Sequence, residues 1–220
     1  MCGGPEDDSA GAAKYPDHAS FVAREEEILL RRFTGLVCLA ACLRCTAAHA
    51  EPMLPADRQA LLLLKVLSYD YRLPQRAKKT VQILVLYRPE ERASRQAGDS
   101  LLRALQALSG YTVHRLPVRA TLVAYRGTAA LDAQLAPLQA SVIYLAPELD
   151  AALPDILALT RKRSLVPVTG LRSYVVSGVP VGAILAGSLP RIAINQRAAQ
   201  LHGMQLSSQL FKVAELVHGP

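Results

Sequence analysis

Cysteine and tryptophan are scarce in this chain of 220 residues, which has four cysteines, no tryptophan and only 5% aromatic residues. The cysteines are Cys2, Cys38, Cys42 and Cys45. A body folded from the residues that follow Cys45 therefore has no disulfide and no thiol chemistry. Cys42-x-x-Cys45 is a single pair inside an apolar run, which is weak evidence for a metal or redox site.

Apolar runs long enough to span a membrane are also missing. The run Phe33–Leu43 is roughly half as long as a helix that crosses a bilayer core. It follows the cations Arg31-Arg32 and precedes the small residues of 47–50. A positive start, a short apolar middle and a small-residue end are typical of a secretory signal peptide. We therefore expect export; a buried core helix of similar length is the alternative.

Two processing sites fit this segment. Ala48-His49-Ala50 suits ordinary signal peptidase and predicts a mature protein that begins at Glu51 and is periplasmic. Leu39–Cys42 instead fits a lipobox, and cleavage there would make Cys42 the lipidated N-terminus that anchors the protein. Soluble export is favoured. Residues 1–50 are thus predicted to be a disordered leader plus signal peptide, and residues 51–220 a single domain.

The predicted mature chain is basic, with 20 Lys and Arg against 11 Asp and Glu, a net charge of +9. Its cations are scattered and not interleaved with aromatic residues, so a nucleic-acid partner is not expected. Only Arg161-Lys162-Arg163 and Lys78-Lys79 form clusters, and we interpret most of these charges as solvated surface. A membrane surface, a cell-wall polymer or an acidic partner fits such a surface better.

Helices and strands alternate through most of the mature chain. The apolar spacing of Leu101, Leu102, Leu105 and Leu108, for example, is typical of an amphipathic helix, whereas TVQILVLY is apolar on both faces like a strand inside a parallel sheet. The predicted helices are 56–69, 93–108, 128–138 and 150–163, and the predicted strands are 80–87, 112–118 or 122–125, 141–146 and 165–169. This order predicts an α/β fold with a mainly parallel sheet flanked by helices.

The pattern changes after Gly170. Short strands are predicted at 174–177, 181–186 and 189–194, with a tight hairpin at Ala186-Gly187-Ser188. These features predict an antiparallel edge in the C-terminal part of the sheet. A helix from Asn195 to about Leu201 follows, and a last amphipathic helix is predicted at 205–217, with Leu210, Val213, Ala214 and Val217 facing inward.

The C-terminal segment 190–217 resembles the YfiR family of exported bacterial proteins. Its matching features are Ile194-Asn195, Ala198-Ala199, Gly203, Leu206-Ser207-Ser208 and Lys212-Val213-Ala214. The likeness extends loosely over nearly the whole mature chain. The resemblance implies a periplasmic regulator that holds an inner-membrane diguanylate cyclase inactive, limiting cyclic di-GMP and biofilm formation. It also implies a homodimer; the disulfides of that family have no counterpart after Cys45.

No residue set indicates catalysis, a cofactor or a metal. His202, at a helix end, and His218 are interpreted as surface or capping groups. Because ligands of open α/β sheets settle beyond the carboxyl ends of strands, a small anion would bind at Thr169, Gly170 and Arg172. The alternative is a structural turn with no ligand. Asn195, Ser207 and Ser208 are expected to be structural caps of helices.

These observations favour a non-enzymatic regulator that acts by protein contact on the periplasmic part of an inner-membrane signalling protein. Its apolar first helix or an exposed sheet edge would supply the contact. The alternative is a periplasmic small-ligand-binding module that resembles half of a solute-binding protein.

Overall fold

A computed structural model describes residues 51–219 of the chain. The predicted leader, signal peptide and Cys42 lipobox lie outside the described residues and stay predictions. Among residues 51–219, no helix combines the length and the apolar character that a membrane span requires.

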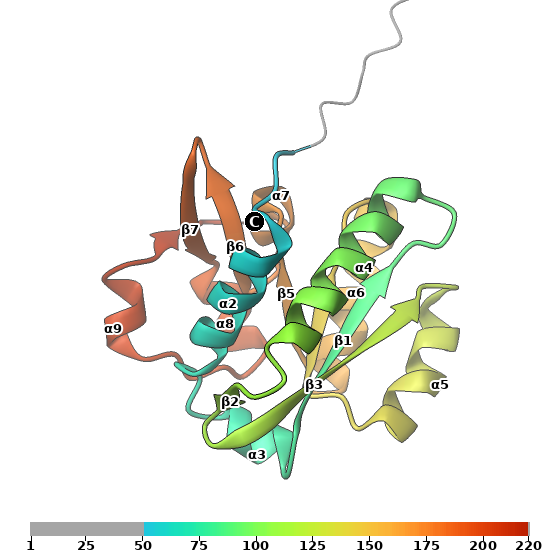
Figure 1. Cartoon of the computed structure of the whole chain (residues 1–220), viewed down its shortest axis with the longest axis horizontal. Coiled ribbons are helices and arrows are strands. Elements are labelled where there is room, and N and C mark those ends of the chain that lie inside the picture. The colour runs from blue at the N-terminus through green and yellow to red at the C-terminus, as the bar shows by residue number, and fades with distance from the viewer. Residues whose placement is uncertain (1–50, 220) are drawn as a thin grey trace, which may run out of the picture. The chain divides into compact units, whose positions relative to one another are not determined.

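One mixed sheet of eight strands organises the described residues, in the order β2-β3-β1-β4-β5-β6-β7-β8. Figure 1 shows the sheet with its helices, the N-terminal elements in blue and green and the C-terminal ones in orange and red. The strands are β1 (Val81–Tyr87), β2 (Thr112–Val113), β3 (Leu116–Ala124), β4 (Val142–Leu145), β5 (Val166–Thr169), β6 (Val181–Ala186), β7 (Leu189–Ile194) and β8 (Glu215–Leu216). From β3 to β6 all neighbours are parallel, and β6 pairs with β7 in antiparallel fashion. The predicted fold class is confirmed.

Helices cover both faces of this sheet. They are α2 (Ala56–Leu67), α3 (Leu73–Ala77), α4 (Arg92–Ala107), α5 (Thr128–Leu138), α6 (Leu153–Lys162), α7 (Arg172–Val176), α8 (Gln196–Leu201) and α9 (Ser208–Phe211). A 3₁₀ turn, Asp150–Ala152, precedes α6, so the helix predicted at 150–163 begins later.

Strand β1 shows why the sheet is sandwiched between helices. Its alternate side chains point to opposite faces. Ile83 and Val85 pack in a cluster with residues of α2 and α4, whereas Leu84 and Leu86 pack in a second cluster with residues of α5 and α6. The sequence VQILVLY is apolar at nearly every position because both of its faces are buried.

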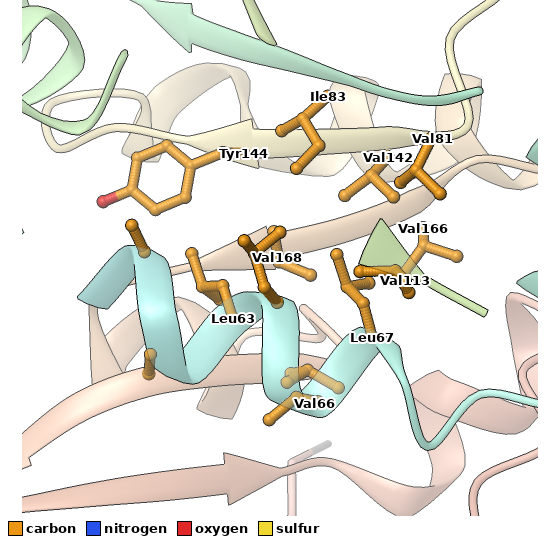
Figure 2. Close-up of a cluster of buried hydrophobic side chains, with 14 of the residues drawn as sticks. Leu63, Val66, Leu67, Val81, Ile83, Val113, Val142, Tyr144, Val166 and Val168 are labelled. Atoms are coloured by element: carbon orange, nitrogen blue, oxygen red, sulfur yellow. The ribbon is translucent and has the colours of Figure 1, made fainter. Parts of the chain in front are cut away.

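Helix α2 is the most enclosed helix of the first cluster. Figure 2 shows Leu63 and Leu67 on the side of α2 that faces the sheet, toward Val168 of β5 and Val113 of β2. Leu64, Val66 and Leu67 have no exposed surface. Burial of one such leucine contributes about 1.5–3 kcal/mol to folding.

Two predictions for the C-terminal part are wrong. Residues 174–177 were expected to form a strand, but Tyr174, Val175 and Val176 belong to α7. The helix predicted at 205–217 is only the single turn α9, after which β8 pairs with β7 in parallel. Val213, expected to face inward, is 64% exposed. The backbone after α9 pairs with β7 instead, and the Val217 N–H donates to the Ile194 carbonyl over 2.8 Å.

Two further differences have local causes. The alternatives 112–118 and 122–125 merge into the hairpin of β2 and the longer β3, which turns at His114 and Arg115, both with positive φ. The short helix α3, which was not predicted from the sequence, has Pro74 in its first turn. Proline suits the first turn of a helix, where its missing N–H has no helical partner.

Candidate functional site

The predicted anion site lies at the carboxyl end of β5, where the structure brings Thr169, Gly170 and Arg172 together. The Thr169 side chain is buried. Its hydroxyl donates a hydrogen bond to the Leu145 carbonyl over 3.1 Å and accepts one from the Leu171 N–H over 3.2 Å. Thr169 therefore stabilises the turn and has little capacity left for a ligand.

Side chains of α2 and of the segment before it pack tightly against Gly170. A Cβ atom at this position would come within 1.9 Å of Gln59 Nε2 and 2.8 Å of the Met53 methyl group. A Cβ atom there would push both side-chain ends aside, and Gln59 is held by two buried hydrogen bonds, so the close approach of α2 and its preceding segment favours glycine. The place where a ligand would touch the backbone of Gly170 is occupied by the protein's own side chains.

Gln59 belongs to a buried polar network that sequence reasoning missed. Its Nε2 donates to the Ala183 carbonyl over 3.3 Å, and its Oε1 accepts from the Tyr144 hydroxyl over 3.0 Å. Burial raises the pKa of the Tyr144 phenol, so the hydroxyl stays protonated as a donor. The network ties α2 to β4 and β6 across the first cluster, a structural role for a polar residue in an apolar core.

The backbone N–H groups at the start of α7 already hold a carboxylate, that of Glu51. The amides of Arg172 and Ser173 donate to Glu51, the latter over 3.1 Å, and the Ser173 hydroxyl donates over 2.6 Å. Free amides at a helix start favour negative charge. The first described residue of the chain thus supplies the anion at this turn.

The Arg172 side chain is likewise engaged. Its Nε and Nη2 donate to Glu215 Oε1 of β8 over 3.0 and 2.8 Å. Arg172 thereby links the start of α7 to the last strand of the sheet. A small anion that bound at Thr169, Gly170 and Arg172 would have to displace Glu51, Glu215 or both. The anion site stays a prediction that includes this displacement.

The neighbouring strand end, after β4, is closed by Tyr174 of α7. The Tyr174 hydroxyl accepts from the Leu149 N–H over 2.6 Å and donates to Asp150 Oδ2 over 3.1 Å. Burial of the ring and the nearby Asp150 carboxylate raise the pKa of this phenol. The carboxyl ends of β4 and β5 are therefore held together by side-chain hydrogen bonds.

The three expected caps lie at helix starts. Asn195 Oδ1 accepts from the Ala198 N–H of α8 over 2.9 Å, and its Nδ2 donates to the Val175 carbonyl over 3.0 Å. Ser207 Oγ accepts from the Gln209 N–H over 3.3 Å, while Ser208 is the exposed first residue of α9. Asn195 thus joins α8 to α7 as well as capping α8.

His202 is the C-cap of α8, as the capping interpretation expected, but it is buried and not a surface group. Nδ1 lies 3.0 Å from the Ala198 carbonyl and Nε2 lies 3.1 Å from the Thr160 hydroxyl. Burial, assisted by the positive charges of Arg161 and Arg76, lowers the pKa of His202. Over the described range no three His, Cys, Asp or Glu side chains gather as metal ligands do.

The family of the chain follows from a family model for YfiR/HmsC-like proteins, which matches residues 56–215. This range includes every helix of the described fold and all of its strands except the last residue of β8. The chain belongs to the YfiR/HmsC-like family. The resemblance inferred from the C-terminal motifs is confirmed. No curated protein matches the chain.

Three solved structures have a similar fold, and one of them is a substrate-binding protein. An ABC domain from Streptococcus pneumoniae in complex with L-Trp is 13% identical, with a TM-score of 0.55, and the match covers 74% of this chain and 60% of that one. A ligand-free, open substrate-binding protein with adhesive properties from Clostridium difficile is 13% identical, with a TM-score of 0.50 and coverage of 68% and 58%.

A conserved domain protein from Vibrio cholerae O1 biovar El Tor is 16% identical, with a TM-score of 0.51 and coverage of 76% and 61%. The chain spans about three fifths of the length of each of these three structures. At such identities the likeness concerns the fold. The YfiR/HmsC-like domain thus shares its α/β fold with these three structures.

Proposed function

We propose that this YfiR/HmsC-like protein is an exported regulator that inhibits a membrane-bound diguanylate cyclase, or a related signalling protein, by contact with its periplasmic part. The observation that carries the proposal is the family match over residues 56–215. YfiR-like proteins are regulatory and periplasmic, and they typically interact with a membrane signalling protein on that side. Cyclic di-GMP and biofilm formation are the expected outputs.

The C-terminal sheet edge, defined by Val213 and Leu216, is our proposed contact surface. Leu216, in the edge strand β8, is 46% exposed, and Val213, just before β8, is 64% exposed. An edge strand has unpaired backbone groups that can pair with a strand from another chain. Exposed apolar side chains next to such an edge add buried area on association.

The first helix, the other surface expected from the sequence, supports contact less well. The apolar side of α2 faces the sheet (Figure 2), and Leu61 is the residue of α2 with a large exposed apolar side chain, at 46%. A partner that used α2 would have to bind its outer, mostly polar surface.

Deletion and complementation test both the function and the surface. Deleting the gene should raise cellular cyclic di-GMP, and the wild-type chain should restore the low level. Leu216→Asp should fail to restore it, whereas Leu61→Asp, an equal change on α2, should succeed. Unchanged cyclic di-GMP after deletion would contradict the function, and failure of Leu61→Asp alone would move the surface to α2.

A second candidate function is a periplasmic small-ligand-binding module. The fold shared with a substrate-binding protein and with an ABC domain in complex with L-Trp favours it. The chain would then correspond to part of such a protein. A ligand that binds the folded state raises the unfolding temperature, so screening small solutes, L-Trp among them, by thermal unfolding tests this function. A hit combined with unchanged cyclic di-GMP after deletion would favour it over regulation.

A further inference from the structure

A cavity of about 520 Å³ opens at the opposite end of the sheet, where β1, β4 and β5 begin. Its walls come from the segments before those three strands and from the end of α8. Small-ligand sites in proteins are commonly about 300–1,000 Å³. The cavity is therefore large enough for a small molecule.

Five cationic side chains line this basic cavity, and no carboxylate does. They are Arg72, Arg76, Lys78, Arg161 and Arg163, with His202 among the remaining wall residues. The cations belong to two stretches of sequence about ninety positions apart, which meet because β1, β4 and β5 are neighbours in the sheet. Such a convergence of like charges costs free energy unless counter-charges compensate it.

Two of the cations have carboxylate partners that do not line the cavity themselves. Arg76 Nη1 lies 2.8 Å from Asp70 Oδ2, and its Nη2 donates to the His202 carbonyl over 3.1 Å. Arg163 Nε lies 2.6 Å from Asp132 Oδ1. These partners fix the two guanidinium groups in place at the wall.

The other three cations, Arg72, Lys78 and Arg161, have no carboxylate within 4.0 Å among residues 51–219. Three positive charges thus remain after the two carboxylates are subtracted. Arg161 and Arg76 also lower the pKa of the buried His202 beside them, in addition to the effect of burial. The local potential is therefore positive at the cavity wall itself.

Helix dipoles do not account for this charge. The C-terminal ends of α3, α6 and α8 lie around the cavity, and each helix end is equivalent to at most roughly half a negative charge. Three ends offset about one and a half of the three remaining charges. The two short helices contribute less, so a net positive charge is left for a bound anion.

We infer that this basic cavity binds a phosphorylated ligand. Arg72, Lys78 and Arg161 contact its phosphoryl oxygens, and Arg76, fixed by Asp70, adds positive charge at the wall. Arginine forms paired, charge-assisted hydrogen bonds with such oxygens, and lysine supplies a point charge. The ligand is either a free phosphorylated molecule or the phosphate of a lipid headgroup. This inference is independent of the proposed regulatory contact at the C-terminal sheet edge.

Titration calorimetry with inorganic pyrophosphate at low ionic strength tests the site, using protein obtained by expression of the full chain. The double variant Arg72→Gln, Arg161→Gln should weaken binding about a hundredfold, since each lost charge-assisted bond accounts for about tenfold. Both side chains are exposed, so the variant should unfold at the wild-type temperature in the absence of pyrophosphate.

The matched control is Arg58→Gln, Arg92→Gln, which removes the same charge from the exposed starts of α2 and α4, away from the cavity. It should change the affinity by less than about twofold, because only weak, screened long-range attraction is lost. Equal weakening in both double variants would mean unspecific attraction by net charge and would overturn the inference.

Vesicles distinguish the two ligand sources. A lipid headgroup is the source if the wild-type protein binds phosphatidylglycerol vesicles but neither phosphatidylcholine vesicles nor pyrophosphate. The cavity variant should then lose the binding to phosphatidylglycerol vesicles. Saturable binding of pyrophosphate assigns a free ligand. Failure of both probes with the wild-type protein would overturn the inference.

Discussion

At the carboxyl ends of β4 and β5 the groups that could bind an anion are already used by the protein, whereas at the amino ends of β1, β4 and β5 three cations have no carboxylate partner among residues 51–219. Glu51 binds the start of α7 and Glu215 binds Arg172. Arg72, Lys78 and Arg161 line an open cavity instead.

The difference shows that the usual ligand position of an open α/β sheet need not be the available one. Carboxyl-end turns bind anions because helix starts expose N–H groups. Here the segment before α2 covers that end with Glu51 and Met53, and Gly170 permits the close contact. The opposite end has charge and space but few backbone donors, so any ligand there must be recognised by side chains.

The largest expected effect concerns the support of the basic cavity, the pair of Asp70 and Arg76. Asp70 is fully buried and also accepts hydrogen bonds from the backbone of Arg72 and Gln205, over 3.1 and 2.9 Å. Asp70→Ala should lower the free energy of unfolding by about 3–5 kcal/mol, because Arg76 loses its buried counter-charge. Urea unfolding measures this loss. Asp57→Ala, at an exposed site on α2, should cost less than about 1 kcal/mol.

At the carboxyl end the corresponding test is Gly170→Ala. The added methyl group would overlap Gln59 and Met53, so we expect a loss of about 1–3 kcal/mol. Gly110→Ala is the control, because no atom lies within 4 Å of a Cβ at that position. If both variants unfold at the same urea concentration, Gln59 and Met53 pack less tightly against Gly170 than in the structure.

Much of the fold could be predicted because its signals are local. The strands 80–87 and 141–146 are short, rich in β-branched residues and apolar on both faces, and this combination is typical of buried parallel strands. The strand prediction for 174–177 was wrong because Val175 and Val176 favour strands. The start of α7 is instead stabilised by the carboxylate of Glu51, a residue more than a hundred positions earlier in the sequence. Similarly, β8 exists through its pairing with β7, which no local pattern of 205–217 encodes.

The candidate sites divide in the same way. Thr169, Gly170 and Arg172 could be placed at a strand end from sequence, but the occupation of that turn by Glu51 and Glu215 depends on tertiary contacts. The clusters Lys78-Lys79 and Arg161–Arg163 were visible as charge runs and were interpreted as solvated surface. Their meeting around one cavity follows only from the neighbouring positions of β1, β4 and β5.

A smaller effect is expected from His202 at the wall of the basic cavity. Its folded-state pKa lies below the usual value of about 6.5, so the unfolded chain binds the proton more readily. The free energy of unfolding should therefore fall as the pH decreases through about 6.5 toward the lower folded-state value. Thermal unfolding between pH 7.5 and 5.5 measures the slope. His202→Gln should flatten it, and an identical slope in that variant would assign the pH dependence to other groups.

The smallest effects separate the two ends of the sheet directly. Glu51→Ala removes the carboxylate that caps α7 and should cost about 1 kcal/mol in urea unfolding. Arg172→Ala breaks the exposed pair with Glu215 and should cost no more than about 1 kcal/mol. Neither substitution should alter pyrophosphate affinity by more than about twofold, because both lie at the end of the sheet opposite the basic cavity. A tenfold loss of pyrophosphate affinity in Arg172→Ala would instead place the anion at Thr169, Gly170 and Arg172, with Glu51 as its displaceable competitor.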